Sequence, residues 1–158
     1  MNESTIRDFF ENSLSPAELD RAWANAFIEE LRSDGTVVRR LRTTDLPEAY
    51  AVVPSDVVAL IDAVRSGALS LKALDAICFA LEASDKFEWD TDTPAGEHVA
   101  RSLFWLGSPE VNYPLTPVVL TKIRRYVLTG EDTFTRDDLR SKPTSARTIN
   151  IREPKRDV

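Results

Sequence analysis

The sequence predicts a mainly α-helical protein, folded as a compact bundle of about six helices. Three observations support this fold class. Serine or threonine, often followed by proline, stands where five segments begin, and these residues cap helix starts. Apolar residues inside the segments repeat every three or four positions, which is the period of a helix with one buried face. Glycines follow several of the segments, as is usual just past a helix end: Gly35, Gly67, Gly107 and Gly130.

Two helices are expected in the N-terminal part. The first covers about residues 4–12, and the second covers 16–32. The second begins at a capping box, Ser15–Glu18, with proline at its first helical position, and it ends before Gly35. Its buried face is predicted to carry apolar residues at helical spacing: Leu19, Trp23, Phe27 and Leu31.

Residues 36–53 have a different character. The stretches 36–42 and 49–53 are rich in β-branched residues, which favour strands. We interpret this region as either a small β-hairpin or an irregular edge of the bundle.

Two helices are predicted to follow in the middle of the chain. One begins at Pro54 and ends before Gly67. The next covers about 71–83 and is apolar on nearly all sides, which is typical of a helix at the centre of a bundle. Cys78 lies within it and is expected to be a core thiol rather than a reactive one.

The last two helices are delimited by clear signals. Thr93-Pro94 begins one of them, which is broken at Gly107. Thr116-Pro117 begins the other, which ends before Gly130. The loop between them, residues 108–115, contains two prolines and is therefore stiff.

The 158 residues are expected to form one helical domain, 1–140, and a basic, flexible tail, 141–158. The net charge is −6, with 15 Lys and Arg against 24 Asp and Glu in the domain and 5 against 2 in the tail. Ile149 and Ile151 alternate with polar residues, so a docked strand in the tail is the alternative. An acidic domain argues against nucleic acid as a partner and is compatible with a basic protein.

The composition also bears on location. A single cysteine rules out an internal disulfide, so nothing indicates an oxidising compartment. The first residues show neither the basic nor the apolar region of a secretory signal. The longest apolar run, 76–81, is far too short to span a bilayer. We therefore expect a cytoplasmic protein with no membrane partner.

The chain shows no recognisable catalytic machinery, and we expect it to have no enzyme activity, cofactor or metal site. The one histidine, His98, lies near the start of a predicted helix, which favours a solvent-facing role. The five glycines never have the spacing of a phosphate-binding loop. Asp90 and Asp92 fail the calcium-loop template, since its sixth and twelfth positions hold Ala95 and Arg101. Magnesium bound by two carboxylates, in a metal-dependent enzyme, stays open as an alternative.

The most distinctive segment is 83–97, which combines acidic residues with two aromatic ones. A second, proline-stiffened loop flanks the same predicted helix at its opposite end. Together they supply the candidate partner-binding residues: Asp85, Glu88, Trp89, Asp90, Asp92 and Glu97 from the first segment, and Glu110, Asn112 and Tyr113 from the second.

Two interpretations of these residues compete. In the functional one, the carboxylates pair with Arg or Lys of a partner, while Trp89 or Tyr113 supplies an aromatic anchor. In the structural one, Phe87 and Trp89 pack into the bundle, and the acidic residues cap the next helix and face water.

Part of the chain resembles known proteins. The stretches 76–90 (AICFALEASDKFEWD) and 108–116 (SPEVNYPLT) are similar to a group of small, acidic, helical bacterial proteins of mostly unassigned function. Some of those proteins resemble immunity proteins, which bind and neutralise a toxin. The resemblance implies a stoichiometric inhibitor whose acidic face occludes the basic active site of a cognate toxin.

The sequence therefore leaves three functional hypotheses. The first is a non-catalytic immunity-type or antitoxin-type protein that binds a basic partner. The second is a regulatory or adaptor module that binds through its tail. The third is a metal-dependent enzyme that uses the acidic loop.

Overall fold

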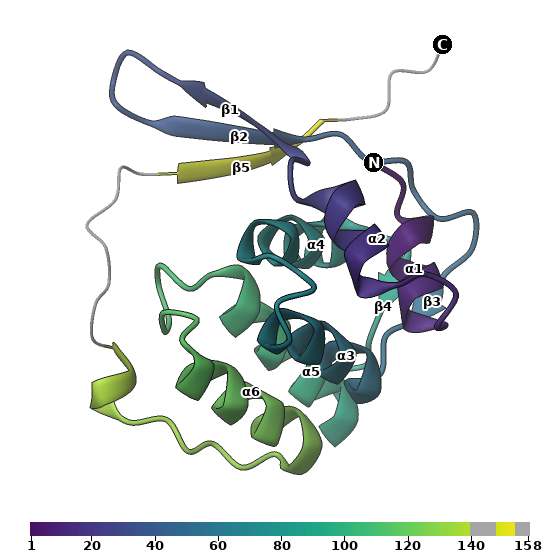
Figure 1. Cartoon of the computed structure of the whole chain (residues 1–158), viewed down its shortest axis with the longest axis vertical. Coiled ribbons are helices and arrows are strands. Elements are labelled where there is room, and N and C mark those ends of the chain that lie inside the picture. Colours follow the sequence, from purple (N-terminus) through teal and green to yellow (C-terminus); the bar gives the residue numbers. More distant parts are fainter. Residues whose placement is uncertain (140–147, 154–158) are drawn as a thin grey trace.

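The computed structural model describes residues 1–139 and 148–153 (Figure 1). Within these ranges the chain forms six α-helices, one 3-10 helix and five strands. The helices are α1 (Ser4–Phe10), α2 (Pro16–Trp23), α3 (Pro54–Arg65), α4 (Leu71–Ala83), α5 (Pro94–Gly107), α6 (Pro117–Thr129) and the 3-10 helix η1 (Arg136–Leu139). The strands are β1 (Phe27–Leu31), β2 (Val37–Leu41), β3 (Tyr50–Ala51), β4 (Phe87–Glu88) and β5 (Thr148–Arg152).

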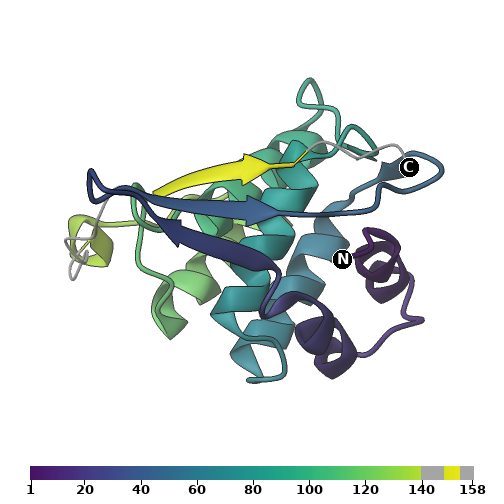
Figure 2. The ribbon, with the colours of Figure 1, turned by 90° about the horizontal axis from the view of Figure 1, so that it is seen from above.

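The strands make two small sheets. In the larger sheet the order is β1-β2-β5, with β1 antiparallel and β5 parallel to β2. In the smaller one, β3 pairs in parallel with β4. The larger sheet lies across one side of the helical body (Figure 2). The predicted number of helices is confirmed, but the fold is a mixed α/β arrangement in which helices dominate rather than a pure bundle.

The predicted helix over 16–32 is wrong beyond Trp23. The chain leaves α2 there and forms β1, which a turn at Asp34-Gly35 joins to β2. Gly35 has a φ of 82°, and the Arg32 amide donates to the Thr36 carbonyl at 2.8 Å across this turn. The glycine that we interpreted as a helix end therefore closes a hairpin.

The prediction for residues 36–53 is correct in strand content and wrong in pairing. Both β-rich stretches contain a strand, β2 and β3, but they do not pair with each other. β2 takes its partners from 27–31 and 148–152, and β3 takes its partner from 87–88. The hairpin of this fold is thus β1–β2.

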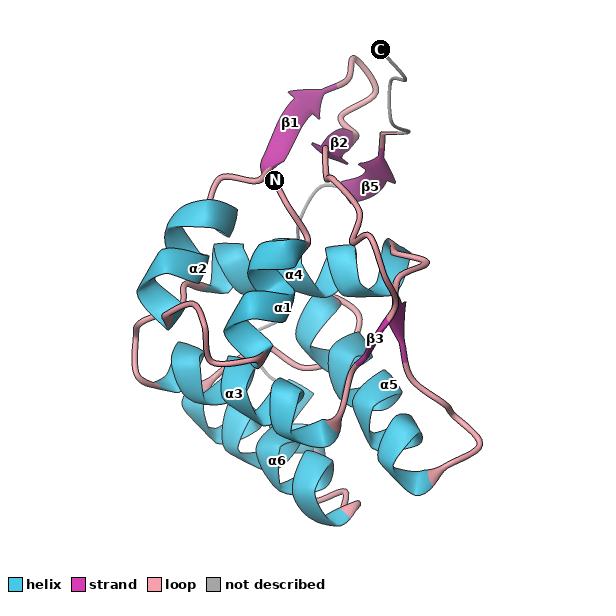
Figure 3. Cartoon of the chain, turned by 90° about the vertical axis from the view of Figure 1, so that its right-hand side faces the viewer, coloured by secondary structure: helices cyan, strands magenta, loops and turns pink. Residues whose placement is uncertain are grey.

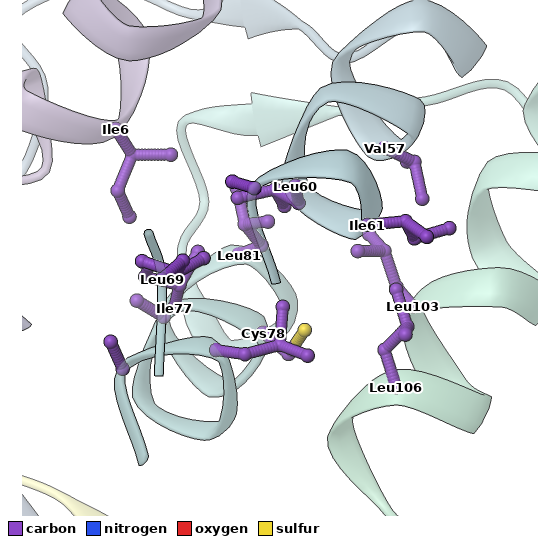
Figure 4. Close-up of a cluster of buried hydrophobic side chains, with 14 of the residues drawn as sticks. Ile6, Val57, Leu60, Ile61, Leu69, Ile77, Cys78, Leu81, Leu103 and Leu106 are labelled. Carbon is purple, nitrogen blue, oxygen red and sulfur yellow. The ribbon is translucent and has the colours of Figure 1, made fainter. Parts of the chain in front are cut away.

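The hydrophobic core lies between the helices, with α4 at its centre. α4 packs against α2, α3 and α5, as its nearly all-round apolar surface predicts. Cys78 is fully buried, so the prediction of a core thiol is confirmed, and burial raises its pKa well above the ordinary value. Figure 4 shows part of this core, with side chains from α1, α3, α4 and α5 converging around Cys78.

The predicted capping residues start their helices. Ser15 forms the capping box of α2, and Ser70, Thr93 and Thr116 each accept an amide hydrogen bond at the start of α4, α5 and α6. In the described ranges, no helix is both long and apolar enough to cross a lipid bilayer.

Part of the stretch that we expected to be a flexible tail is a strand. Residues 148–152 form β5, so the docked strand is the correct alternative for them, while 140–147 and 154–158 lie outside the described residues. Arg152 secures β5 to the body. Its Nη1 donates to the Ala83 carbonyl at 2.7 Å, its Nη2 lies 3.1 Å from Glu3 Oε1, and it also pairs with Asp45.

Glu3 is the buried partner in this network. Its side chain has no exposed surface, and its Oε2 accepts hydrogen bonds from the Leu46 amide at 3.1 Å and the Ser84 hydroxyl at 3.0 Å. Burial raises the pKa of Glu3, and the two hydrogen bonds and Arg152 act in the opposite direction. The network joins the N-terminal segment, the end of α4 and the last described strand.

Candidate functional site

The acidic segment runs from the end of α4 through β4 into the first turn of α5. Figure 3 shows the loop between the β3–β4 pair and the start of α5 standing out from the helices. All five predicted acidic residues of the segment are exposed: Asp85, Glu88, Asp90, Asp92 and Glu97. Asp85, Glu88 and Asp92 have no Lys or Arg within ion-pair distance in the described part of the chain. These three carboxylates are therefore available to a partner.

Asp90 and Glu97 have structural roles as well. Asp90 Oδ1 accepts a hydrogen bond from the Asp92 amide at 2.9 Å, and its carbonyl accepts one from the Thr93 hydroxyl at 2.7 Å. Thr93 in turn caps α5 through the Gly96 amide at 3.1 Å. Glu97 lies 3.8 Å from Arg101, one helical turn away. For these two acids the structural interpretation is the better supported one.

Gly96 holds the acidic turn close to α5. A Cβ atom at this position would lie 1.7 Å from the Asp90 carbonyl oxygen, a distance that no side chain can occupy. The backbone of Asp90 therefore packs directly on the first turn of the helix. This contact fixes the position of the turn that carries Asp90 and Asp92.

The two aromatic residues of the segment pack inward. Phe87 is buried and lies edge-on to Tyr50, with ring centroids 6.2 Å apart. Trp89 is half-buried and packs against the core. Neither ring is freely displayed, so the exposed groups of this segment are mainly its carboxylates.

The second predicted loop closes the other end of α5. The Asn112 side-chain amide donates to the Ser108 carbonyl at 2.9 Å and caps the helix C-terminus. Tyr113 stacks on Phe134, with ring centroids 4.1 Å apart and an interplanar angle of 8°. Glu110 is exposed. Asn112 and Tyr113 are thus engaged within the chain, and Glu110 is the accessible group.

The structure separates the two predicted loops. α5 has 14 residues, so its ends lie about 20 Å apart at 1.5 Å per residue. A row of aromatic rings along α5 and α6 connects them, with neighbouring ring centroids 4.1 to 5.1 Å apart. The row is His98, Tyr126, Trp105, Phe134 and Tyr113. Phe134 was not among the predicted residues, because one aromatic residue beyond a helix-ending glycine carries no periodic signal.

A groove opens beside the acidic end of this row, between the start of α5 and the end of α6. It has a volume of about 390 Å³ and is lined mainly by polar residues. They include Asp92, Glu97, His98, Arg101, Tyr126 and Asp132.

The groove already holds one cation of the protein itself. The Arg101 guanidinium carbon lies 5.8 Å from the Tyr126 ring and 6.0 Å from the Trp105 ring, with Glu97 beside it. The arrangement of carboxylates around aromatic faces is therefore suited to guanidinium groups. Asp132 and Arg101 add to the residues that sequence reasoning missed.

The described residues contain no cluster of side chains that could hold a metal ion. They contain no group of three or more His, Cys, Asp or Glu side chains placed to hold an ion.

Comparisons of the chain with protein-family models, curated proteins and solved structures find no significant match.

Proposed function

We propose that this protein is a non-catalytic binding protein whose acidic segment, 83–97, binds a basic protein in the cytoplasm. One observation carries the proposal: Asp85, Glu88 and Asp92 stand exposed along one short segment, from the bend after α4 through β4 to the turn before α5, without a cationic partner in the described residues. Each of these carboxylates can pair with Arg or Lys of a partner without first breaking an internal ion pair.

The overall charge supports this proposal. A net charge of −6 produces a field that attracts a cationic partner and speeds its association. Such steering weakens as salt rises, since the screening length is about 10 Å at 0.1 M ionic strength. Complex formation should therefore be faster at low salt.

The partner class follows from the resemblance of 76–90 and 108–116 to immunity-like proteins. A toxin that acts on nucleic acid has a cationic active site, because phosphate binding requires one. An exposed acidic turn can occlude such a site without any chemistry of its own. The proposal is therefore an immunity-type or antitoxin-type inhibitor of a cognate toxin.

The test is affinity capture of the partner from the native host with variants of the acidic turn. Asp85→Asn, Glu88→Gln and Asp92→Asn combined should reduce capture at least tenfold, while far-UV helicity is unchanged. Trp89 and Asp90 stay as they are, because the first packs on the core and the second builds the start of α5.

A matched control removes the same amount of charge elsewhere. Glu11→Gln, Glu30→Gln and Glu131→Gln combined change three exposed carboxylates, each of which lies within 4.0 Å of an arginine of its own chain. Capture should persist in this variant. If both triple variants capture equally well, the acidic turn is not the binding surface.

A further inference from the structure

The β1–β2 hairpin has one free edge. β2 lies in the middle of the larger sheet, and β5 covers its other side, so β1 forms the outer edge (Figure 2). In the described part of the chain, no strand pairs with the outer side of β1. A strand edge of this kind offers a row of unpaired backbone groups to an incoming segment.

The hairpin register identifies these groups. The Arg32 amide bonds to the Thr36 carbonyl, so residues 32 and 36 form a hydrogen-bonded pair. In an antiparallel ladder such pairs alternate with pairs whose backbone groups point away. The N–H and C=O groups of Phe27, Glu29 and Leu31 therefore point toward the open edge.

The side chains of the same three residues share one face of the sheet. Phe27 lies against Phe79 of α4, with ring centroids 5.6 Å apart, and Leu31 is 73% exposed. Glu29 stands between them, exposed and without an ion-pair partner among the described residues. The free edge thus presents an apolar, an acidic and an apolar position in alternation.

We propose that β1 accepts an extended segment of a partner protein as an additional strand. The segment has the pattern apolar–x–Lys/Arg–x–apolar, so that its cation pairs with Glu29 and its apolar residues cover Phe27 and Leu31. Backbone hydrogen bonds to the three outward-pointing residues supply the remaining affinity.

Charge excludes a second copy of this chain as the occupant. Antiparallel pairing of β1 with itself over all five residues places Glu29 directly opposite Glu29. Two like charges in directly opposed positions are unfavourable. A partner segment with Lys or Arg opposite Glu29 replaces this repulsion with an attractive ion pair.

The opposite edge of β2 shows that this sheet accepts a strand from a distant part of the sequence. β5 pairs there although it lies more than 100 residues away along the chain. A side-chain bond accompanies the pairing, since Arg39 Nε donates to Asn150 Oδ1 at 2.9 Å. The free edge of β1 contains no residue of the acidic segment, so the strand-pairing proposal does not depend on the proposed function.

The test uses a synthetic peptide, acetyl-Ser-Val-Thr-Arg-Thr-Val-Ser-amide, titrated into the labelled full chain by NMR. We expect the amide signals of Phe27, Glu29 and Leu31 to shift most. Glu29→Lys should weaken binding about tenfold, equivalent to about 1.4 kcal/mol. The same variant should gain affinity for a peptide with Glu in place of Arg. The control Glu48→Lys, which changes an exposed acid outside the hairpin, should leave both affinities unchanged.

Three results would overturn the inference as a whole, and a fourth would overturn the part assigned to Glu29. The first is the absence of binding by the Arg peptide, and the second is a set of shifted amides centred away from β1. The third is concentration-dependent dimerisation through β1, detected by sedimentation, since it would make a second copy the occupant. Affinity that is equal for the Arg and Glu peptides would also contradict the role of Glu29.

Discussion

At the scale of single residues, Gly96 shows how a backbone contact positions a surface turn. The Asp90 carbonyl oxygen lies where any Cβ of residue 96 would stand. The chain reaches this arrangement through Asp90 and Thr93, which hydrogen-bond within the turn. The acidic turn and the first turn of α5 therefore behave as one unit.

Substitution of Gly96 by alanine should be strongly destabilising. The Cβ forces the Asp90 turn away from α5, at a cost of about 3 kcal/mol in the free energy of unfolding. Gly67→Ala is the control, because Gly67 has a φ of 80° and open space around it, so the cost there is about 1 kcal/mol. Urea unfolding measures both variants. Equal costs would show that the turn is not locked to the helix.

Glu82 should make the stability of the protein depend on pH. Glu82 is exposed to solvent, but its carboxyl group is partly surrounded by protein atoms. The resulting loss of hydration raises the pKa of Glu82 from 4.5 to about 7. The folded state then holds this proton more tightly than the unfolded state. The stabilising contribution is complete below pH 4.5 and is lost as pH rises through about 7.

Glu82→Gln should remove this contribution to the pH profile. Between about pH 5 and about pH 8, the wild type should lose stability relative to the variant. Urea unfolding at both pH values measures the difference. Glu48→Gln is the control, and it should follow the wild type. A wild-type curve parallel to that of Glu82→Gln would contradict the raised pKa.

At the scale of elements, the sequence predicts the later helices well and the hairpin poorly. α4, α5 and α6 begin at capping Ser or Thr side chains, α3 begins at a proline, and glycines mark the ends of α3, α5 and α6, because those signals act locally. The pattern of Phe27 and Leu31 is ambiguous. Residues four apart share a face in a helix and also in a strand, so the same spacing fits both structures. Only the pairing of β1 with β2 decides between them, and sequence spacing does not reveal that pairing.

The exposure of Leu31 gives a direct test of this correction. In the predicted helix Leu31 would be buried with Leu19, whereas in β1 it is 73% exposed and Leu19 is fully buried. Leu31→Ser should therefore change the free energy of unfolding by no more than about 0.5 kcal/mol. Leu19→Ala should cost about 2–5 kcal/mol. Thermal and urea unfolding measure the free energy of unfolding of both variants. A large loss of stability in Leu31→Ser would support the helix instead.

At the scale of the whole molecule, the sequence located the acidic segment but not its surroundings. The exposed positions of Asp85, Glu88 and Asp92 follow from local polarity. The inward packing of Trp89 and the stacking of Tyr113 depend on segments that are distant in the sequence, such as the one that carries Phe134. Tertiary contacts of this kind leave no periodic pattern to recognise.

Arg152 connects the most distant described parts of the chain. Arg152→Met leaves the Glu3 carboxylate buried without its counter-charge and should cost about 3 kcal/mol in the free energy of unfolding. Arg42→Met is the matched control. Its ion pair with Glu153 lies near the surface, and the Arg42 side chain is 63% exposed, so the cost should stay below about 1 kcal/mol.

A double-mutant cycle separates the ion pair from other effects. Glu3→Gln in the Arg152→Met background removes the unpaired charge and should recover part of the lost stability. Urea unfolding of the two single variants and the double variant supplies the coupling energy. A coupling energy near zero would show that the pair does not hold β5.

The Glu3–Arg152 pair also has a consequence for how the protein is made. Glu3 is synthesised 149 positions before its guanidinium partner, Arg152. The Glu3 carboxylate therefore has no guanidinium partner until Arg152 has been synthesised. Closure of the sheet and burial of this charge as an ion pair therefore belong to a late stage of folding, since contacts that span so many residues form late.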